Sequence, residues 1–381
     1  MSTYEQLPLS GPEPRASRAP RTTAALAWAR GAWDVVVLEA QQRLRSRGWY
    51  IMLAVWFVLI GIVTWLTWAA FTAQQAANRS SPGVPALSEP GGLIFEVVLL
   101  FVLFLASIVA PALSANAVNG DRSHGTLAVL QASLLRPGQI LAGKMVAAWI
   151  AAFVFLVAAS PFLVVGVAVG RLSPAYVIVA VGALTLELGV ICAVGTAVSA
   201  LAARPVFSIV VTYLVVAMLC VGTVVAFAFG ASILGRGTVQ ANDYRVTSLP
   251  TNHAVPVYGC TGTLRDVPAV HTERVAWLLA MNPYVVVADV IPYPDRSQSA
   301  SPAPQGAVEV ISQGARIALA GPEAVTQCAN GVPRQSYLVQ TTPLWPLGLG
   351  LQLALAGVLM WGARRALVTP AKRLARGTRV A

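Results

Sequence analysis

Six long apolar runs constrain this chain more than any other feature of its sequence. The hydrocarbon core of a bilayer is about 30 Å thick, and a helix needs about 20 apolar residues to cross it. The runs that reach this length are Trp49–Phe71, Leu93–Val118, Met145–Gly170, Leu172–Ala202, Val206–Leu234 and Leu344–Ala363. Only 11% of the residues are charged, whereas a soluble domain carries about 25%. The sequence therefore predicts an α-helical integral membrane protein with six transmembrane helices, and it excludes an ordinary soluble enzyme.

Basic residues are distributed unevenly between the two sides that these spans would define. One side carries 17 Arg and Lys residues in its terminal segments and short loops, whereas the short loops of the other side carry only Arg79 and Arg171. Because basic loops stay in the cytoplasm, both termini are predicted to be cytoplasmic. Arg accounts for 24 of the 26 basic residues, a bias typical of GC-rich genomes, so we expect a multi-pass protein of a bacterial plasma membrane. The charges flank apolar runs, which favours contact with the lipid bilayer and argues against nucleic acid as a partner.

The segments outside the spans differ in character. Residues 1–22 are rich in Pro, Ser and Arg and are predicted to be a disordered cytoplasmic tail. Residues 23–48 are predicted to form an amphipathic helix in the cytoplasmic interface of the membrane, because their apolar residues recur at helical spacing. Its apolar face contains Trp33, Val37 and Leu44. The remaining membrane parts are transmembrane helices one to five within 49–234, with a loop at 119–144, the sixth helix at 344–363 and a basic cytoplasmic tail at 364–381.

The stretch 235–343 is the only sizeable hydrophilic region of the chain, and it is predicted to form a small extracytoplasmic domain of mixed secondary structure. Within it, the apolar segment 275–291 is short for a span and is interrupted by Pro283, so we expect a re-entrant segment there. Cys260 and Cys328 both belong to this domain, outside the reducing cytoplasm. We therefore expect the two cysteines to form a disulfide.

No catalytic constellation is present in the sequence. The three histidines have no metal-ligand spacing with each other or with cysteine, so we expect no metal site. The segment Gly138–Met145 matches a phosphate-binding loop in seven of eight positions, but it lacks the Ser or Thr that holds magnesium, and a span follows it directly. We interpret it as a short turn into the third span, with Lys144 at the lipid headgroups. The chain is thus predicted to have no enzymatic activity and no cofactor of its own.

The most specific piece of sequence follows the second span. Segment 119–144 contains an acidic and basic pair, then Gly-Thr-Leu, a Leu-rich stretch and a Gly-Lys pair that enters the next span. This order resembles the cytoplasmic loop of ABC-2-type transporter permeases. The matching positions are Asp121, Arg122, Gly125, Thr126, Leu127, Leu130, Pro137, Gly143 and Lys144. The resemblance also implies the layout already predicted, with six spans, both termini inside, an interface helix and a re-entrant segment before the last span.

The resemblance implies partners as well. A separate cytoplasmic ABC ATPase subunit, in two copies, would bind ATP and Mg, and a second permease chain, identical or homologous, would complete the complex. Leu127, Leu130 and Leu134 are spaced to lie on one face of a short helix in the loop. A groove on the ATPase can bind such an apolar face, so that movement of the ATPase is transmitted to the spans. The predicted ATPase-coupling residues are Asp121, Arg122, Gly125, Thr126, Leu127, Leu130 and Leu134.

The sequence therefore predicts the membrane-spanning permease subunit of an ABC-2-type transporter that moves an amphipathic or lipidic substrate, with export as the expected direction. One alternative is an ion- or proton-coupled secondary transporter that uses Glu187, because an acid in the middle of a span is costly and often functional. Glu187 could line a substrate path, carry a proton or make a structural hydrogen bond. The other alternative is a membrane-anchored sensor or assembly factor that acts through its extracytoplasmic domain.

Overall fold

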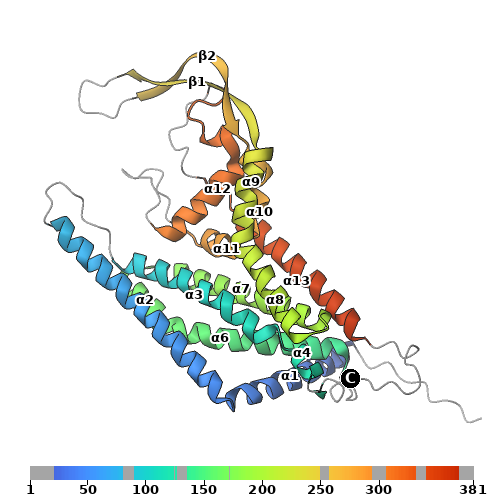
Figure 1. Cartoon of the computed structure of the whole chain (residues 1–381). Coiled ribbons are helices and arrows are strands. Elements are labelled where there is room, and N and C mark those ends of the chain that lie inside the picture. Colours follow the sequence, from blue (N-terminus) through green and yellow to red (C-terminus); the bar gives the residue numbers. More distant parts are fainter. Residues whose placement is uncertain are drawn as a thin grey trace, which may run out of the picture.

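Six helical segments long and apolar enough to cross a membrane form the body of the molecule. The computed structural model describes residues 21–79, 90–123, 125–126, 135–170, 172–248, 257–293, 306–331 and 340–368. The six segments are α2 (Arg47–Arg79), α3 (Pro90–Ser114), α6 (Pro137–Gly170), α7 (Pro174–Leu201), the fifth span from Pro205 to Leu234, and α13 (Trp345–Leu367). They confirm the prediction of an α-helical integral membrane protein. Two further helices, α1 (Arg21–Leu44) and α4 (Asn119–Ser123), lie at one end of the bundle (Figure 1).

Helices α3, α6 and α7 form the centre of the bundle. Their contact faces bury large apolar side chains, such as those of Leu103, Phe155 and Leu184. Small residues let the backbones approach closely, since a Cβ atom at Gly166 of α6 would lie 2.9 Å from the backbone nitrogen of Phe95 in α3. Close packing of this kind holds helices together in lipid, where no hydrophobic force drives them into contact. The centre of the molecule is therefore set by shape complementarity between three spans.

The polar stretch between the fifth and sixth spans forms a group of elements at the opposite end of the bundle from α1 and α4 (Figure 1). These elements are β1 (Arg236–Ser248), β2 (Val257–Val270), η2 (Thr272–Arg274), α10 (Ala276–Ala280), α11 (Pro283–Val290) and α12 (Ala307–Val325). The two strands pair antiparallel, with Arg236 opposite Val270, and form a long hairpin that projects away from the helices. We call this end of the molecule the hairpin end. The segment predicted to be re-entrant is a helix pair, α10 and α11, that breaks before Pro283.

The fifth span is a composite helix whose middle is a π-helical turn. It consists of α8 (Pro205–Ala217), η1 (Met218–Gly222) and α9 (Thr223–Leu234). Asn282, at the break between α10 and α11, donates from Nδ2 to the carbonyl oxygen of Cys220 at 2.7 Å and to Thr223 Oγ1 at 3.0 Å. A π-turn leaves backbone carbonyls without their usual helical partners. The tip of the α10–α11 pair thus supplies the hydrogen bond that the turn in the fifth span requires.

A buried carboxylate, Asp289, fastens the hairpin end to the sixth span. Its Oδ2 atom accepts hydrogen bonds from the backbone nitrogens of Leu344 and Trp345, at 2.5 and 2.8 Å, at the start of α13. Its Oδ1 atom accepts from Ser312 Oγ at 2.9 Å and from Arg316 Nε at 2.5 Å, both on α12. A carboxylate at a helix N-terminus is favourable because the first backbone N–H groups have no partner within the helix. One side chain therefore joins α11, α12 and α13.

Candidate coupling site between α1, α4 and α6

A buried lysine brings three helices together at the end of the bundle opposite the hairpin. Lys144, on α6, is only 1% exposed, and its Nζ atom pairs with the carboxylates of Glu39 on α1 and, at 2.6 Å, Asp121 on α4. We call these three residues the Lys144 junction. The prediction that Lys144 lies at the lipid headgroups is wrong, because the two carboxylates neutralise its charge inside the protein. An ammonium group has three donors and can bind both acids at once.

Helix α6 begins earlier than predicted, and this places Lys144 in its second turn. The helix starts at Pro137, a residue suited to the first helical position because it has no N–H group to satisfy. Gln139 accepts a hydrogen bond from the backbone nitrogen of Arg136 at 2.7 Å and donates to the carbonyl oxygen of Trp28 at 2.9 Å. The segment that resembles a phosphate-binding loop is therefore helical, and its lysine is already paired within the chain.

Helix α1 packs on α6 along its small and β-branched residues. Val35 and Val36 are buried, and a Cβ atom added at Gly143 of α6 would lie only 2.6 Å from the carbonyl oxygen of Ala32. The three residues predicted for the apolar face, Trp33, Val37 and Leu44, are all exposed. A helix in the membrane interface presents such a face to lipid. The helix thus has two apolar sides, one against α6 and one outside the protein.

Arg43 completes the charge balance around the junction. Its guanidinium donates to the carbonyl oxygen of Leu113 at 3.1 Å, at the end of α3. Burial lowers the pKa of Arg43 below its usual range, while the negative charge of Glu39 opposes that shift. The last carbonyls of a helix lack partners within it and attract cations. Through Arg43, helix α1 contacts the second span as well as the third.

The start of the predicted coupling loop is held on the end of α7. Arg122 donates to Asn119 Oδ1 at 2.9 Å and to the carbonyl oxygens of Ala202 at 2.7 Å and Ala200 at 3.3 Å. Ser199 Oγ accepts from the backbone nitrogen of Asn119 at 3.1 Å. The guanidinium therefore caps the carbonyl end of α7. Arg122, which the sequence suggests as an ATPase contact, binds this chain's own backbone.

Gly125 and Thr126 lie beyond α4 and are exposed. Gly125 has φ of +75°, a left-handed conformation that ends α4 and that a glycine adopts without strain. Thr126 Oγ1 donates to the carbonyl oxygen of Asp121 at 3.3 Å. The other predicted coupling residues, which lie outside the described residues, are Leu127, Leu130 and Leu134. The described part of the loop is therefore exposed at Gly125 and Thr126.

Substituting Gly143 with alanine is expected to push α1 off α6. The new Cβ atom would lie 2.6 Å from the carbonyl oxygen of Ala32 and 2.7 Å from Val35 Cβ, so the helices must separate. Overpacking of this kind costs about 1–3 kcal/mol. Hydrogen exchange of α1 should become faster. Gly138→Ala is the matched control, since its Cβ would meet nothing nearer than Arg364 Nε at 3.5 Å; equal exchange in the two variants would contradict the packing described.

Glu187 lies on α7 and is not part of the Lys144 junction. It is 1% exposed, and neither of its carboxyl oxygens has a hydrogen-bond partner among the described residues. Its carboxyl group lies near the side chain of Gln352 on α13. Glu187 also belongs to the wall of a cavity of about 260 Å³ between α7, α11 and α13. The structure therefore places this acid in a separate, membrane-embedded site.

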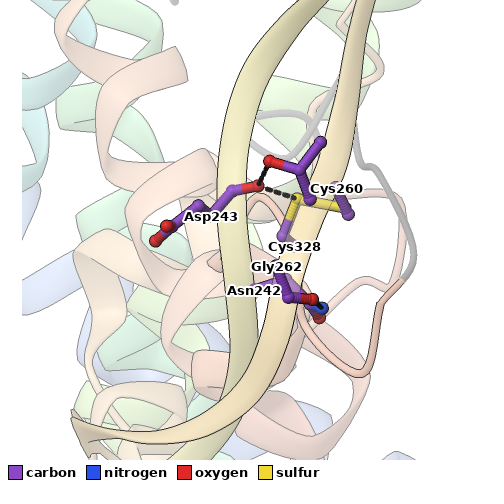
Figure 2. Close-up of a disulfide and its surroundings, with 6 residues drawn as sticks. Asn242, Asp243, Cys260, Gly262 and Cys328 are labelled. Carbon is purple, nitrogen blue, oxygen red and sulfur yellow. Dashed lines mark hydrogen bonds between the residues drawn. A yellow bond between two sulfur atoms is a disulfide. The ribbon is translucent and has the colours of Figure 1, made fainter.

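Cys260 and Cys328 form the disulfide that the sequence predicts (Figure 2). The bond joins β2 to the segment that follows α12, across a sequence separation of 68 residues. That segment also runs alongside β1, because the backbone nitrogen of Asn242 donates to the carbonyl oxygen of Cys328 at 3.2 Å. In Figure 2, Asp243 of β1 lies beside the disulfide, and Asn242 Nδ2 donates to the carbonyl oxygen of Gly262 at 2.8 Å. The hairpin is thus tied to the helical part of its domain.

Two features of the junction are not predicted from the sequence: the participation of Glu39, and the burial of Lys144 in an ion pair. The signal available in the sequence was a lysine at the edge of an apolar run, together with acids in segments predicted to lie at the same membrane face. A charged group inside a span normally has an oppositely charged partner. The sequence could therefore indicate that Lys144 needs an acid, but not which one.

Comparison with known proteins identifies the family of this chain. The family model described as ABC-2 family transporter protein matches residues 33–315. The matched range begins within α1 and includes the first five spans, the Lys144 junction, the hairpin and half of α12. No curated protein matches the chain significantly. Because the match spans well over half of the chain and the structure has six spanning helices, this chain belongs to the ABC-2 family of transporter proteins.

Proposed function

We propose that this chain is the membrane-spanning permease subunit of an ABC transporter that exports an amphipathic or lipidic substrate. Two copies of a separate ABC ATPase subunit bind ATP and Mg and hydrolyse the nucleotide, and the permease itself has no enzymatic activity. A second permease chain, identical or homologous, completes the pathway. The complex lies in a bacterial plasma membrane with both termini of the permease in the cytoplasm. The basic loops at the α1 and α4 end support this orientation.

The observation that carries the proposal is the Lys144 junction. It joins the interface helix, the loop that precedes the exposed Gly125 and the third span through one charge cluster. An ATPase that moves the loop thereby moves α1 and α6 together, since separating the charges in a buried site is costly. Arg122 passes the same motion to the fourth span through the carbonyl end of α7. A rigid link between loop and spans is the requirement of mechanical coupling.

Leu127→Asp tests this coupling. A charge on the apolar ridge of the loop is expected to abolish the response of the spans to ATP without unfolding them, because the ridge can no longer enter a groove on the ATPase. The readout is hydrogen exchange of α10 and α11, measured with and without ATP on the permease in nanodiscs with its co-purifying ATPase. Leu264→Asp is the control, because Leu264 is 51% exposed on β2 at the hairpin end. An unchanged ATP response in Leu127→Asp would refute the loop as the coupling element.

A proton-coupled secondary transporter is the second candidate function. The observation that favours it is the buried Glu187 carboxyl group without a hydrogen-bond partner among the described residues. This candidate requires no ATPase. Flux that follows a proton gradient in the purified chain alone, and that Glu187→Gln abolishes, would select it over the permease.

A further inference from the structure

The membrane-embedded site around Glu187 contains acceptors without donors. Among the described residues, Glu187 Oε1, Glu187 Oε2 and Gln352 Oε1 are buried and have no hydrogen-bond partner. The amide nitrogen of Gln352 donates one of its two N–H groups to the carbonyl oxygen of Met281 at 3.1 Å, so it can supply at most one of the donors that these acceptors need. No ion pair among the described residues includes Glu187. Buried acceptors are costly unless a donor reaches them.

An apolar cavity adjoins these acceptors. It measures about 260 Å³, and Glu187 is the one charged residue among the described residues of its wall. The other walls are apolar and come from three elements, with Leu186 on α7, Val286 on α11 and Trp345 on α13 among them. A water molecule takes up about 30 Å³, so the cavity is several times larger than one water. Its lining suits a hydrocarbon chain and offers water nothing to bind.

Both carboxyl oxygens of Glu187 are buried, so the carboxyl group lies behind the inner wall of the cavity. A glutamate side chain has three rotatable bonds, so its carboxyl group can change direction by a change of rotamer, and Glu187 already belongs to the wall of the cavity. Gly182, five residues earlier on the same helix, has no atom within 4 Å of its Cβ position and leaves that side of the cavity open. The acid can therefore meet a ligand that enters from the cavity.

We propose that this site binds a single-chain primary amine, with its ammonium group on Glu187 and Gln352 and its hydrocarbon chain in the cavity. An ammonium group has three N–H donors, which matches the three unsatisfied acceptors. Its positive charge also compensates an ionised carboxylate in an apolar environment, where an unpaired charge is expensive. A neutral alcohol supplies one donor and no charge. The site does not depend on ATP-driven transport, so binding can be measured on the permease alone.

The test uses the full chain in nanodiscs with a photoactivatable long-chain primary amine as the probe. Mass spectrometry should locate the crosslinks on α7, α11 and α13, and unlabelled amine should compete while the alcohol of equal chain length should not. Glu187→Gln removes the charge at constant shape and is expected to weaken binding at least about tenfold, as losing a charged hydrogen bond does. Glu323→Gln is the matched control, because Glu323 is exposed on α12.

A second variant keeps the proposal testable if Glu187→Gln folds poorly. Gly182→Leu leaves the carboxyl group intact and fills the cavity, and it is expected to abolish crosslinking. Labelling by the amine that is equal in wild type and in both variants would overturn the proposal. Equal competition against the probe by the unlabelled amine and by the alcohol would also overturn the proposal. Charge would then not contribute to binding, as expected if the carboxyl group of Glu187 is protonated and hydrogen-bonded to Gln352.

Discussion

Lys144→Met is expected to disconnect the coupling loop from the spans and to destabilise the α1 end of the bundle. The substitution keeps the length of the side chain but leaves Glu39 and Asp121 close together without the lysine that lies between their charges. Breaking a fully buried pair costs about 3–5 kcal/mol, and we expect about 2 kcal/mol here because the two acids keep 16% and 27% exposure. ATP-driven transport, or the ATP response of α10 and α11, should fall about tenfold or more.

The control for Lys144→Met removes the acids as well. The triple variant Lys144→Met, Glu39→Gln, Asp121→Asn leaves no unpaired carboxylate at the junction, so its apparent melting temperature should return toward the wild-type value. Its coupling should stay low, since the charge contacts that join the three helices are gone. Size-exclusion chromatography after heating gives the melting temperatures. A triple variant as unstable as Lys144→Met would show that packing of the lysine stem, and not charge, holds the junction.

Asp289→Ala is expected to be the most destabilising substitution at the hairpin end. It leaves Arg316 without its carboxylate and removes the acceptor for two backbone N–H groups at the start of α13. Removing one member of a buried charge pair costs about 3–5 kcal/mol. The apparent melting temperature of the purified chain should fall strongly, and hydrogen exchange of α11 and α12 should become faster.

The matched control lies in the same domain. Asp243→Ala breaks the pair with Arg265, whose side chain is 65% exposed, and exposed pairs contribute about 0–1 kcal/mol. This variant should therefore melt close to wild type. If Asp289→Ala melted no lower than Asp243→Ala, the Asp289 network would not be what fastens α12 to the sixth span.

Hydropathy predicts the spans well, because every spanning helix must be apolar over a fixed length whatever it packs against. The error at the third span has a local cause. Two glycines and a lysine between Pro137 and Met145 read as a turn, whereas the structure continues the helix through them. Gln139 ties the helix start to α1, and Gly143 allows the close approach of that helix. Both features depend on a neighbour that the local sequence does not reveal.

The Lys144 junction shows why sites of this kind resist prediction from one sequence. Glu39 and Lys144 are 105 residues apart, and only the packing of α1 on α6 brings them into contact. The hairpin end has the same difficulty. Helix α12 contains a break at Gly321, where φ is +74°, and Pro322 follows it. Because Gly and Pro are typical of turns, this stretch does not appear helical from its sequence. By contrast, the pairing of Cys260 with Cys328 needed only their shared compartment.

Co-purification tests the central claim most directly. The chain, tagged at its C-terminus, is extracted from its native membrane in mild detergent, and its partners are identified by mass spectrometry. We expect a soluble ABC ATPase in equal amount, retained by the Gly138→Ala variant and lost from the Leu127→Asp variant. A chain that purifies folded but alone, with no associated ATP hydrolysis, would contradict the permease assignment.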